Sequence, residues 1–109
     1  MPHPLGYFLL LVATNIVTMT FEWDETKRQR NIEKHAVDFL DAVQLFDGRP
    51  MVSTYSPRGG EERWATMGIL EGRFITVVWT PRGENTQRLI SAQRARGYER
   101  RTYRTLYGG

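Results

Sequence analysis

The spacing of apolar positions predicts two helices near the start of the chain. A short strand over residues 21–23 precedes Asp24, which can cap a polar helix that runs to about Lys34. Asp38 can cap the next helix, whose apolar residues recur at the i, i+3, i+4 and i+7 positions of one face. These residues are Phe39, Ala42, Val43 and Phe46. Gly48 fits the position at which such a helix ends.

Alternation with a period of two predicts strands in the second half of the chain. The predicted strands cover residues 51–55, 62–70, 73–80 and 87–93, and a last helix covers residues 94–107. The fold class is therefore α+β: a short strand, two helices, an antiparallel β-meander and a C-terminal helix. We expect the helices to lie on one side of the sheet.

The turn Glu71-Gly72 sets the register of the central hairpin, because two residues with glycine suit a tight β-turn. This register places Trp64 opposite Trp79, on the face that also carries Thr66 and Val77. We expect the other face to pack on the helices; it carries Ala65, Met67, Ile69, Phe74 and Val78. In the strand over residues 87–93, one face takes Arg88, Ile90 and Ala92, and the other takes Leu89 and Ser91.

The first 18 residues do not fit this pattern. They are mostly apolar from Leu5 to Val17, but the run is too short and too interrupted for a membrane span. A signal peptide requires basic residues before its apolar run, but no lysine or arginine precedes this one. Met19 reads as a second start. We expect residues 1–18 to be an extension outside the fold and residues 19–109 to form a single domain. A weak membrane anchor is the alternative.

Composition limits the chemistry that is available. The 109 residues suit one domain with a modest core, because 40% of them are hydrophobic. The chain has no cysteine, and its two histidines are His3 and His35. Disulfides, thiolate sites and a histidine cluster are thereby excluded, and we expect neither a metal nor a cofactor.

Basic residues gather at the C-terminal end of the chain. Residues 81–109 contain seven of the 15 lysines and arginines, all of them arginine, against Glu84 and Glu99. Arginine binds phosphate with two donors and also stacks on bases. The asymmetry favours an anionic partner, above all RNA. A solvated helix face is the alternative interpretation.

A set of short motifs runs through the chain in a fixed order from about residue 21 to residue 103. The motifs are Phe21-Glu22-Trp23-Asp24, Asn31-Ile32-Glu33-Lys34-His35, Val37-Asp38-Phe39, Ala42, Glu62-Arg63, Gly72-Arg73, Val77-Val78, Thr80-Pro81-Arg82, Arg88-Leu89-Ile90-Ser91-Ala92, Glu99-Arg100 and Tyr103. Together they resemble the BrnT-type toxins of type II toxin–antitoxin systems. The order of the motifs is specific, although no single motif is.

The resemblance implies a RelE-like fold and a cytoplasmic, metal-independent ribonuclease that cleaves RNA and inhibits translation. It implies as partner a BrnA-type antitoxin with a ribbon-helix-helix domain. Operator DNA would be reached only through that antitoxin, and no membrane is implied. A non-catalytic nucleic-acid-binding or interaction module that has lost activity is the alternative function.

Two positions depart from the family pattern. Ala36 stands where the family commonly has a glycine, which would end the helix in a left-handed conformation. Gln93 stands where the family commonly has an arginine. Arg94 follows immediately, but it points to the opposite face if the strand continues. Gln93 therefore bears on activity rather than on the fold.

RNA cleavage without a metal needs a base for the 2′-hydroxyl, an acid for the leaving 5′-oxygen, and fixed positive charge near the phosphate. Arginine suits the third role because its guanidinium stays protonated. The candidate catalytic residues are Glu62, Arg63, Arg73, Arg82, Arg88, Lys27 and His35, with Glu62 as general base. The candidate RNA-binding residues are Arg94, Arg96, Arg100 and Arg104.

The candidate catalytic residues have structural alternatives. Glu62 can form a salt bridge with Arg63 or Arg73, and the arginines can be surface charge on a sheet. Lys27 can be an ordinary exposed lysine. His35 can satisfy the last carbonyls of its helix.

The remaining candidates have alternatives as well. Trp64 and Trp79 can stack on bases or pack on each other across the hairpin. The stripe on the last helix can follow RNA or meet an acidic segment of the antitoxin; it consists of Arg96, Arg100 and Arg104.

Overall fold

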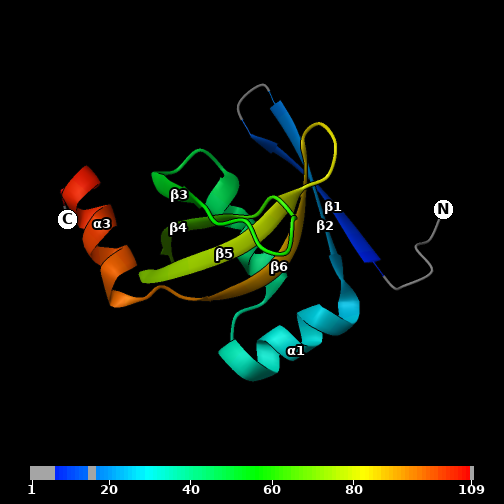
Figure 1. Cartoon of the computed structure of the whole chain (residues 1–109), viewed down its shortest axis with the longest axis horizontal. Coiled ribbons are helices and arrows are strands. Elements are labelled where there is room, and N and C mark those ends of the chain that lie inside the picture. The colour runs from blue at the N-terminus through cyan, green and yellow to red at the C-terminus, as the bar shows by residue number, and fades with distance from the viewer. Residues whose placement is uncertain (1–6, 15–16, 109) are drawn as a thin grey trace.

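The computed structural model describes residues 7–14 and 17–108 of the chain (Figure 1). Its elements are β1 (Tyr7–Thr14), β2 (Val17–Asp24), α1 (Glu25–His35), α2 (Phe39–Ala42), the 3₁₀ helix η1 (Val43–Phe46), β3 (Met51–Tyr55), β4 (Trp64–Leu70), β5 (Arg73–Pro81), β6 (Thr86–Arg94) and α3 (Gly97–Tyr107). Within the described residues, no helix is long and apolar enough to cross a membrane.

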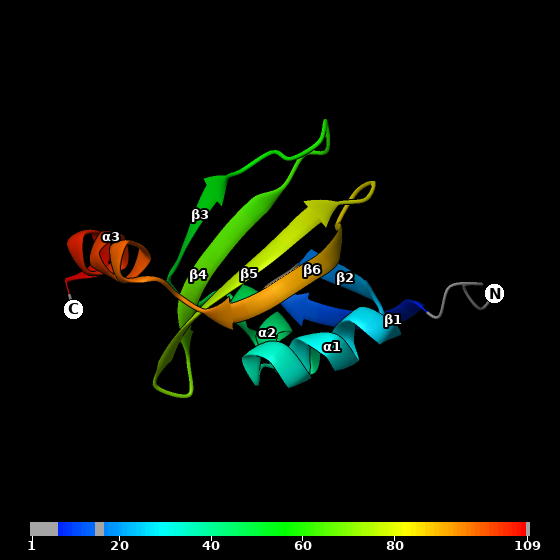
Figure 2. The ribbon, with the colours of Figure 1, turned by 60° about the horizontal axis from the view of Figure 1, so that its bottom comes forward.

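The strands form one six-stranded sheet in the order β1-β2-β6-β5-β4-β3. β3 to β6 pair antiparallel, as the meander predicts, whereas β2 lies parallel to β6. The predicted α+β class is confirmed, and the sheet is mixed. Figure 2 shows α1 and α2 beneath one side of the sheet and α3 at its end, so the helices do not all share one side.

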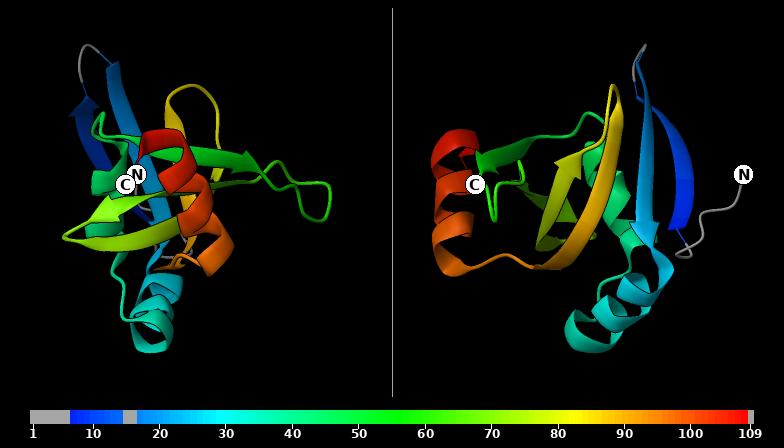
Figure 3. Two further views of the ribbon diagram at one scale, coloured as in Figure 1. Left: turned by 90° about the vertical axis from the view of Figure 1, so that its left-hand side faces the viewer. Right: turned by 45° about the vertical axis from the view of Figure 1, so that its right-hand side comes forward.

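β1 differs from the expectation that residues 1–18 lie outside the fold. It pairs antiparallel with β2, from Tyr7 opposite Asp24 to Thr14 opposite Val17 (Figure 3, right). An apolar stretch can add to an open strand edge because that edge offers unpaired backbone N–H and C=O groups. Residues 1–6 and 15–16 lie outside the described residues.

The central hairpin has the predicted register. Trp64 lies opposite Trp79, and their ring centroids are 6.3 Å apart with the planes 20° from parallel. Glu71 and Gly72 both have positive φ, 49° and 78°, as a type I′ turn requires. The two tryptophans therefore pack on each other, which is the structural alternative given for them.

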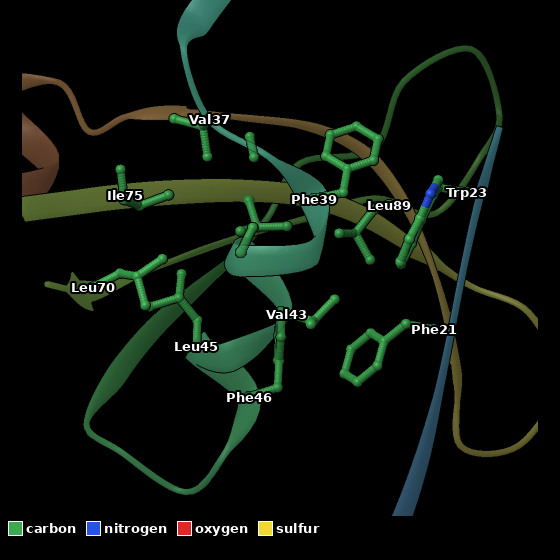
Figure 4. Close-up of a cluster of buried hydrophobic side chains, with 13 residues drawn as sticks. Phe21, Trp23, Val37, Phe39, Val43, Leu45, Phe46, Leu70, Ile75 and Leu89 are labelled. Atoms are coloured by element: carbon green, nitrogen blue, oxygen red, sulfur yellow. The ribbon is translucent and has the colours of Figure 1, made fainter. Parts of the chain in front are cut away.

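The larger core lies on the face of the sheet that carries Thr66 and Val77, which corrects our assignment of the packed face. Its residues are Phe21, Trp23, Val37, Phe39, Ala42, Val43, Leu45, Phe46, Leu70, Ile75, Val77, Leu89 and Ala92 (Figure 4). α2 and η1 bring Phe39 and Leu45 to this core face, and both are fully buried. The other face, called the open face here, is covered in part by α3 through Tyr103.

A β-bulge in β6 changes which residues share a face. Trp79 pairs with Leu89 but Val78 pairs with Ser91, so Ile90 is an extra residue on β6. Leu89 and Ala92 consequently both face the core, although simple alternation assigned them to opposite faces. Arg88, Ser91 and Gln93 lie on the open face.

The ends of the helices follow the sequence closely. Asp24 accepts hydrogen bonds from the backbone N–H groups of Thr26 and Lys27, which confirms it as the cap of α1. Asp38 likewise accepts from the N–H of Leu40. Ala36 ends α1 in the left-handed conformation, with φ 57° and ψ 32°. A Cβ in this conformation costs about 1 kcal/mol relative to glycine.

Arg28 ties α1 to the start of α2. It donates to the carboxylate of Asp38 at 2.8 Å and to that of Glu25 at 2.9 Å. The hydrogen bond from Arg28 is the largest influence on Asp38 and holds the pKa of that carboxyl below its usual value. The carboxylate of Asp38, which caps α2, therefore keeps its charge to a lower pH.

The side chain of Asn31 joins α1 to β6 as if it were a residue of a neighbouring strand. Its Oδ1 accepts from the N–H of Ala92 at 3.1 Å, and its Nδ2 donates to the carbonyls of Ala92 and Val37 at 2.7 and 2.8 Å. β2 pairs with β6 only as far as Glu22 opposite Arg88. The carboxamide therefore continues the edge of β6 where β2 has left it.

We predict that Asn31→Ala lowers the free energy of unfolding by about 2–4 kcal/mol, because three backbone groups lose their buried partner. Urea denaturation followed by circular dichroism measures this change. The matched control is Gln29→Ala on the exposed side of α1, which should change stability by less than about 0.5 kcal/mol. Equal effects of the two substitutions would show that the Asn31 contacts do not hold α1 in place.

Candidate active site

The open face is hollowed between the start of α3 and the loop that joins β3 to β4. The hollow has a volume of about 290 Å³. Arg58 and Arg63 line it from the loop, Gln93 lines it from β6, and Arg96 lines it just before α3. We call it the arginine hollow. The carboxylate of Glu99 also reaches it.

The carboxylate of Glu61 binds one arginine of this hollow, because Nε of Arg63 donates to Oε1 of Glu61 at 2.8 Å. This hydrogen bond is the main cause that lowers the pKa of Glu61, and the charges of Arg82 and Arg88 lower it further. One of the four candidate catalytic arginines thus contacts this carboxylate, and two more lie near enough for their charges to act on it.

The loop between β3 and β4 sets the direction of these side chains (Figure 3, left). Arg58 and Glu61 exchange two backbone hydrogen bonds of 3.0 Å across two glycines with φ of 60° and 78°. Extended backbone follows this tight turn, so successive side chains point to opposite faces. Glu61 and Arg63 consequently lie on the open face, and Glu62 lies on the other.

Glu62, our candidate general base, therefore points away from the arginines. Its Oε2 accepts from the indole N–H of Trp64 at 2.9 Å. Trp64 packs between Tyr55 and Trp79 on the core face of the sheet. The sequence alone did not distinguish Glu61 from its neighbour Glu62 as a candidate base. The predicted face of Trp64 could have done so, because residues two apart on a strand share a face, which puts Glu62 beside Trp64 and Glu61 on the other face.

Arg88 is anchored by a second glutamate. Its Nε and Nη2 donate to Oε2 of Glu22 at 3.2 and 2.9 Å. The two residues lie opposite each other in the parallel pairing of β2 with β6, and Glu22 is only 7% exposed. The parallel strand thus holds the guanidinium beside the site. Glu22 was also missed, because nothing along the chain indicates that residues 22 and 88 meet.

A second hollow adjoins the first, and Ile90 and Ser91 line both. Its volume is about 330 Å³, and its other lining residues are Lys27, Arg30, Asn31, Lys34 and His35. We call it the α1 hollow. The candidates Lys27 and His35 therefore line the same hollow, although eight positions separate them on α1.

Arg73 lies away from the other candidate catalytic arginines. β5 spans 9 residues from Arg73 to Pro81, a rise of about 26 Å, and Arg82 follows its far end. Beside the β4–β5 turn, Arg73 shares with Arg94 and Arg100 a separate hollow of about 250 Å³. The structure therefore does not bring Arg73 to Glu61.

The candidate RNA-binding arginines are divided between these places. Arg96 lines the arginine hollow, whereas Arg94 and Arg100 line the hollow beside Arg73. The guanidinium of Arg104 lies 5.2 Å from the centre of the Phe74 ring. The stripe on α3 thus does not face one partner surface.

Gln93 lies where the family commonly has an arginine, inside the arginine hollow and opposite Thr76 on β5. β6 continues to Arg94, so Arg94 points to the other face and cannot take its place. Thr76 donates to Oε2 of Glu99 at 3.0 Å, while Oε1 of Glu99 accepts from the N–H of Arg96 at 2.8 Å. Glu99 therefore ties the start of α3 to the sheet.

Across the residues that the structure describes, no cluster of three or more metal-ligating side chains occurs.

Comparisons with known proteins show the family of the chain. A family model described as "Ribonuclease toxin, BrnT, of type II toxin-antitoxin system" matches residues 23–99. The crystal structure of the Brucella abortus ribonuclease toxin BrnT matches at 33% sequence identity with a TM-score of 0.53. This match covers 68% of the present chain and 92% of the Brucella chain. A comparison with curated proteins found no match.

The class of protein is therefore a toxin of a type II toxin–antitoxin system. More narrowly, the chain belongs to the BrnT ribonuclease toxin family. Membership of a type II system also implies an antitoxin partner.

We predict that the pKa of the Glu61 carboxyl, measured by NMR titration, lies below the ordinary glutamate value of about 4.3. Arg63→Ala should raise it most, because it removes the direct hydrogen bond, and Arg82→Ala should raise it less. Arg73→Ala is the control and should leave it unchanged. A larger effect from Arg73→Ala than from Arg82→Ala would contradict the convergence of these arginines.

Proposed function

We propose that the chain is a metal-independent endoribonuclease that cleaves RNA on the open face of the sheet. The observation that supports this most strongly is the hydrogen bond of Arg63 to Glu61, with the charges of Arg82 and Arg88 near enough to act on the same carboxylate. Positive charge that favours one carboxylate at this place also favours a phosphate. The carboxylate of Glu61 marks the position that a phosphate oxygen would approach.

In this proposal Glu61 replaces Glu62 as the general base. Glu61 accepts the proton of the 2′-hydroxyl while the 2′-oxygen forms a bond to phosphorus. The bond from phosphorus to the 5′-oxygen breaks, and the 5′-oxygen takes up a proton. Arg63 and Arg82 stabilise the charge that develops on the phosphate.

Binding of RNA would also make Glu61 a stronger base. In the free protein, Arg63 lowers the pKa of Glu61 by a direct hydrogen bond. A phosphate that binds the same guanidinium competes with that bond and adds negative charge nearby. Both effects raise the pKa of a carboxyl group towards its ordinary value. Substrate binding and activation of the base are therefore linked.

The two adjoining hollows provide a path for the RNA on either side of this phosphate. Arg58 and Arg96 contribute positive charge in the arginine hollow, and α1 contributes more in the α1 hollow. Lys27 and His35 line the α1 hollow, and each is a candidate acid for the leaving oxygen. Gln93 offers an amide where the family commonly has an arginine, which weakens phosphate binding at that point.

The proposed cellular role follows the family. Cleavage of RNA in the cytoplasm would inhibit translation, and a BrnA-type ribbon-helix-helix antitoxin would neutralise the toxin. Operator DNA would be bound through that antitoxin. The mixed sheet, with α1 and α2 on one side and α3 at its end, supports the proposal that the fold is RelE-like (Figure 2). One observation favours the alternative of an inactive binding module: Gln93 lies inside the arginine hollow.

We predict that Glu61→Gln lowers kcat for RNA cleavage by about 100-fold, because the general base is lost. KM should not rise, because the substitution removes a negative charge that competes with phosphate. Single-turnover and steady-state cleavage of a labelled RNA by the free toxin measure both constants.

Glu62→Gln is the matched control, because it changes the neighbouring carboxylate on the other face of the sheet. We expect kcat within about twofold of the unmodified chain, since the carboxylate of Glu62 binds the indole of Trp64 and points away from the arginines. A Glu61→Gln variant as active as the original chain would rule out Glu61 as the base. Loss of activity in Glu62→Gln alone would restore Glu62 to that role.

A further inference from the structure

The outer edge of β3 is an open strand edge that lacks the usual protection. β3 is the last strand of the sheet, and four of its five residues are exposed. Its sequence, Met51 to Tyr55, contains no charged residue and no proline. Proteins usually protect such an edge with lysine, proline or a covering segment, because it can pair with another chain.

A groove lined by both apolar and polar side chains runs beside this edge, between β3 and α3. Its volume is about 130 Å³, and its lining residues are Val52, Thr54, Ser56, Ala65, Met67, Tyr98, Glu99 and Thr102. The phenol of Tyr107 donates to the carbonyl of Met51 at 2.8 Å and so fixes α3 beside the start of β3. More apolar surface continues outward from α3, where Leu106 is 62% exposed.

The groove leads directly into the arginine hollow. Ser56, Ala65, Tyr98 and Glu99 line both of them. An extended chain that lies along β3 would therefore carry its next residues to Arg58 and Arg96. The surface gains the positive charges of Arg58, Arg63 and Arg96 along this path.

We propose that an extended segment of the antitoxin binds here as an additional strand on β3. Its apolar side chains fill the groove beside α3, and acidic side chains that follow them reach Arg58 and Arg96. The segment would thereby occupy the arginine hollow and exclude RNA. This inference rests on the proposed function, because it treats the arginine hollow as the RNA site.

The chemistry of the surface favours a polypeptide over RNA as the occupant. A strand edge offers backbone N–H and C=O groups in the spacing of another strand. The groove itself has no lysine or arginine among its lining residues, so it gives RNA phosphates no cation to bind. Arg58 and Arg96, where the groove meets the arginine hollow, are complementary to negative charge on the partner, which an acidic segment supplies.

Hydrogen exchange tests the strand addition, with the full chain and its purified antitoxin. We expect the backbone amides of Ser53 and Tyr55, which point away from β4, to exchange at least about tenfold more slowly in the complex. Unchanged exchange at these amides, with protection on another surface, would overturn the proposal.

A charge substitution in the groove gives a second, independent readout. Thr54→Glu should weaken antitoxin binding by about tenfold or more, because it places a charge in the groove that the apolar side chains of the segment fill. Cleavage of RNA by the free variant should stay within about twofold of the original chain, since Thr54 does not line the arginine hollow. Gln44→Glu is the matched control, because Gln44 is exposed on η1 beside the core face, and it should change neither measurement.

The outcomes separate this inference from the proposed function. Antitoxin binding that Thr54→Glu leaves unchanged would overturn the docking site, even if the free chain cleaves RNA. Absence of cleavage by the original chain would overturn the proposed function, while protection of β3 would still establish the docking site.

Discussion

The pairing of the Asn31 carboxamide with the backbone of Ala92 is the contact on which the arrangement of the site depends. β2 runs beside β6 only from Thr20 to Glu22, and beyond that point the edge of β6 would be unpaired. Asn31 supplies a donor and an acceptor to that edge, and its second donated bond holds the carbonyl of Val37. α1 is thereby fixed alongside β6. The α1 hollow exists because of this placement.

The site also has to hold several positive charges close together before any RNA arrives. Two glutamates make this arrangement stable: Glu22 binds Arg88 from the buried parallel strand, and Glu61 binds Arg63 from the loop. They differ in exposure, because the side chain of Glu22 is 10% exposed whereas that of Glu61 is 39% exposed. An exposed ion pair contributes little stability and exchanges easily with a ligand. We therefore assign a structural role to Glu22 and a role in the reaction to Glu61.

Local chemistry predicted the parts of this fold that neighbouring residues decide. Residue type predicts the helix caps at Asp24 and Asp38 and the β-turn at Glu71. That β-turn sets the register in which Trp64 lies opposite Trp79. The packed face was misassigned because it depends on where α2 and η1 bring their apolar residues. The bulge at Ile90 leaves no signal in a chain whose apolar positions continue on both sides of it.

The site was predicted in composition more than in geometry. The charges of Arg63, Arg82 and Arg88 act on one carboxylate, but Arg73 lies apart from them, because residues at opposite ends of one strand cannot reach one phosphate. The choice between Glu61 and Glu62 depends on a two-glycine turn that decides which glutamate faces the arginines. The order of the motifs does not indicate contacts between residues far apart in the sequence, such as Glu22 with Arg88 and Asn31 with Ala92.

The most direct test is to observe the arginine side chains by NMR while a 2′-O-methylated RNA, which cannot be cleaved by attack of the 2′-oxygen, is added. The account predicts that the Nε–H signals of Arg63, Arg82 and Arg88 shift together as this RNA binds, while the signal of Arg73 stays in place. Shifts confined to Arg73, Arg94 and Arg100, with the first three signals unchanged, would contradict it.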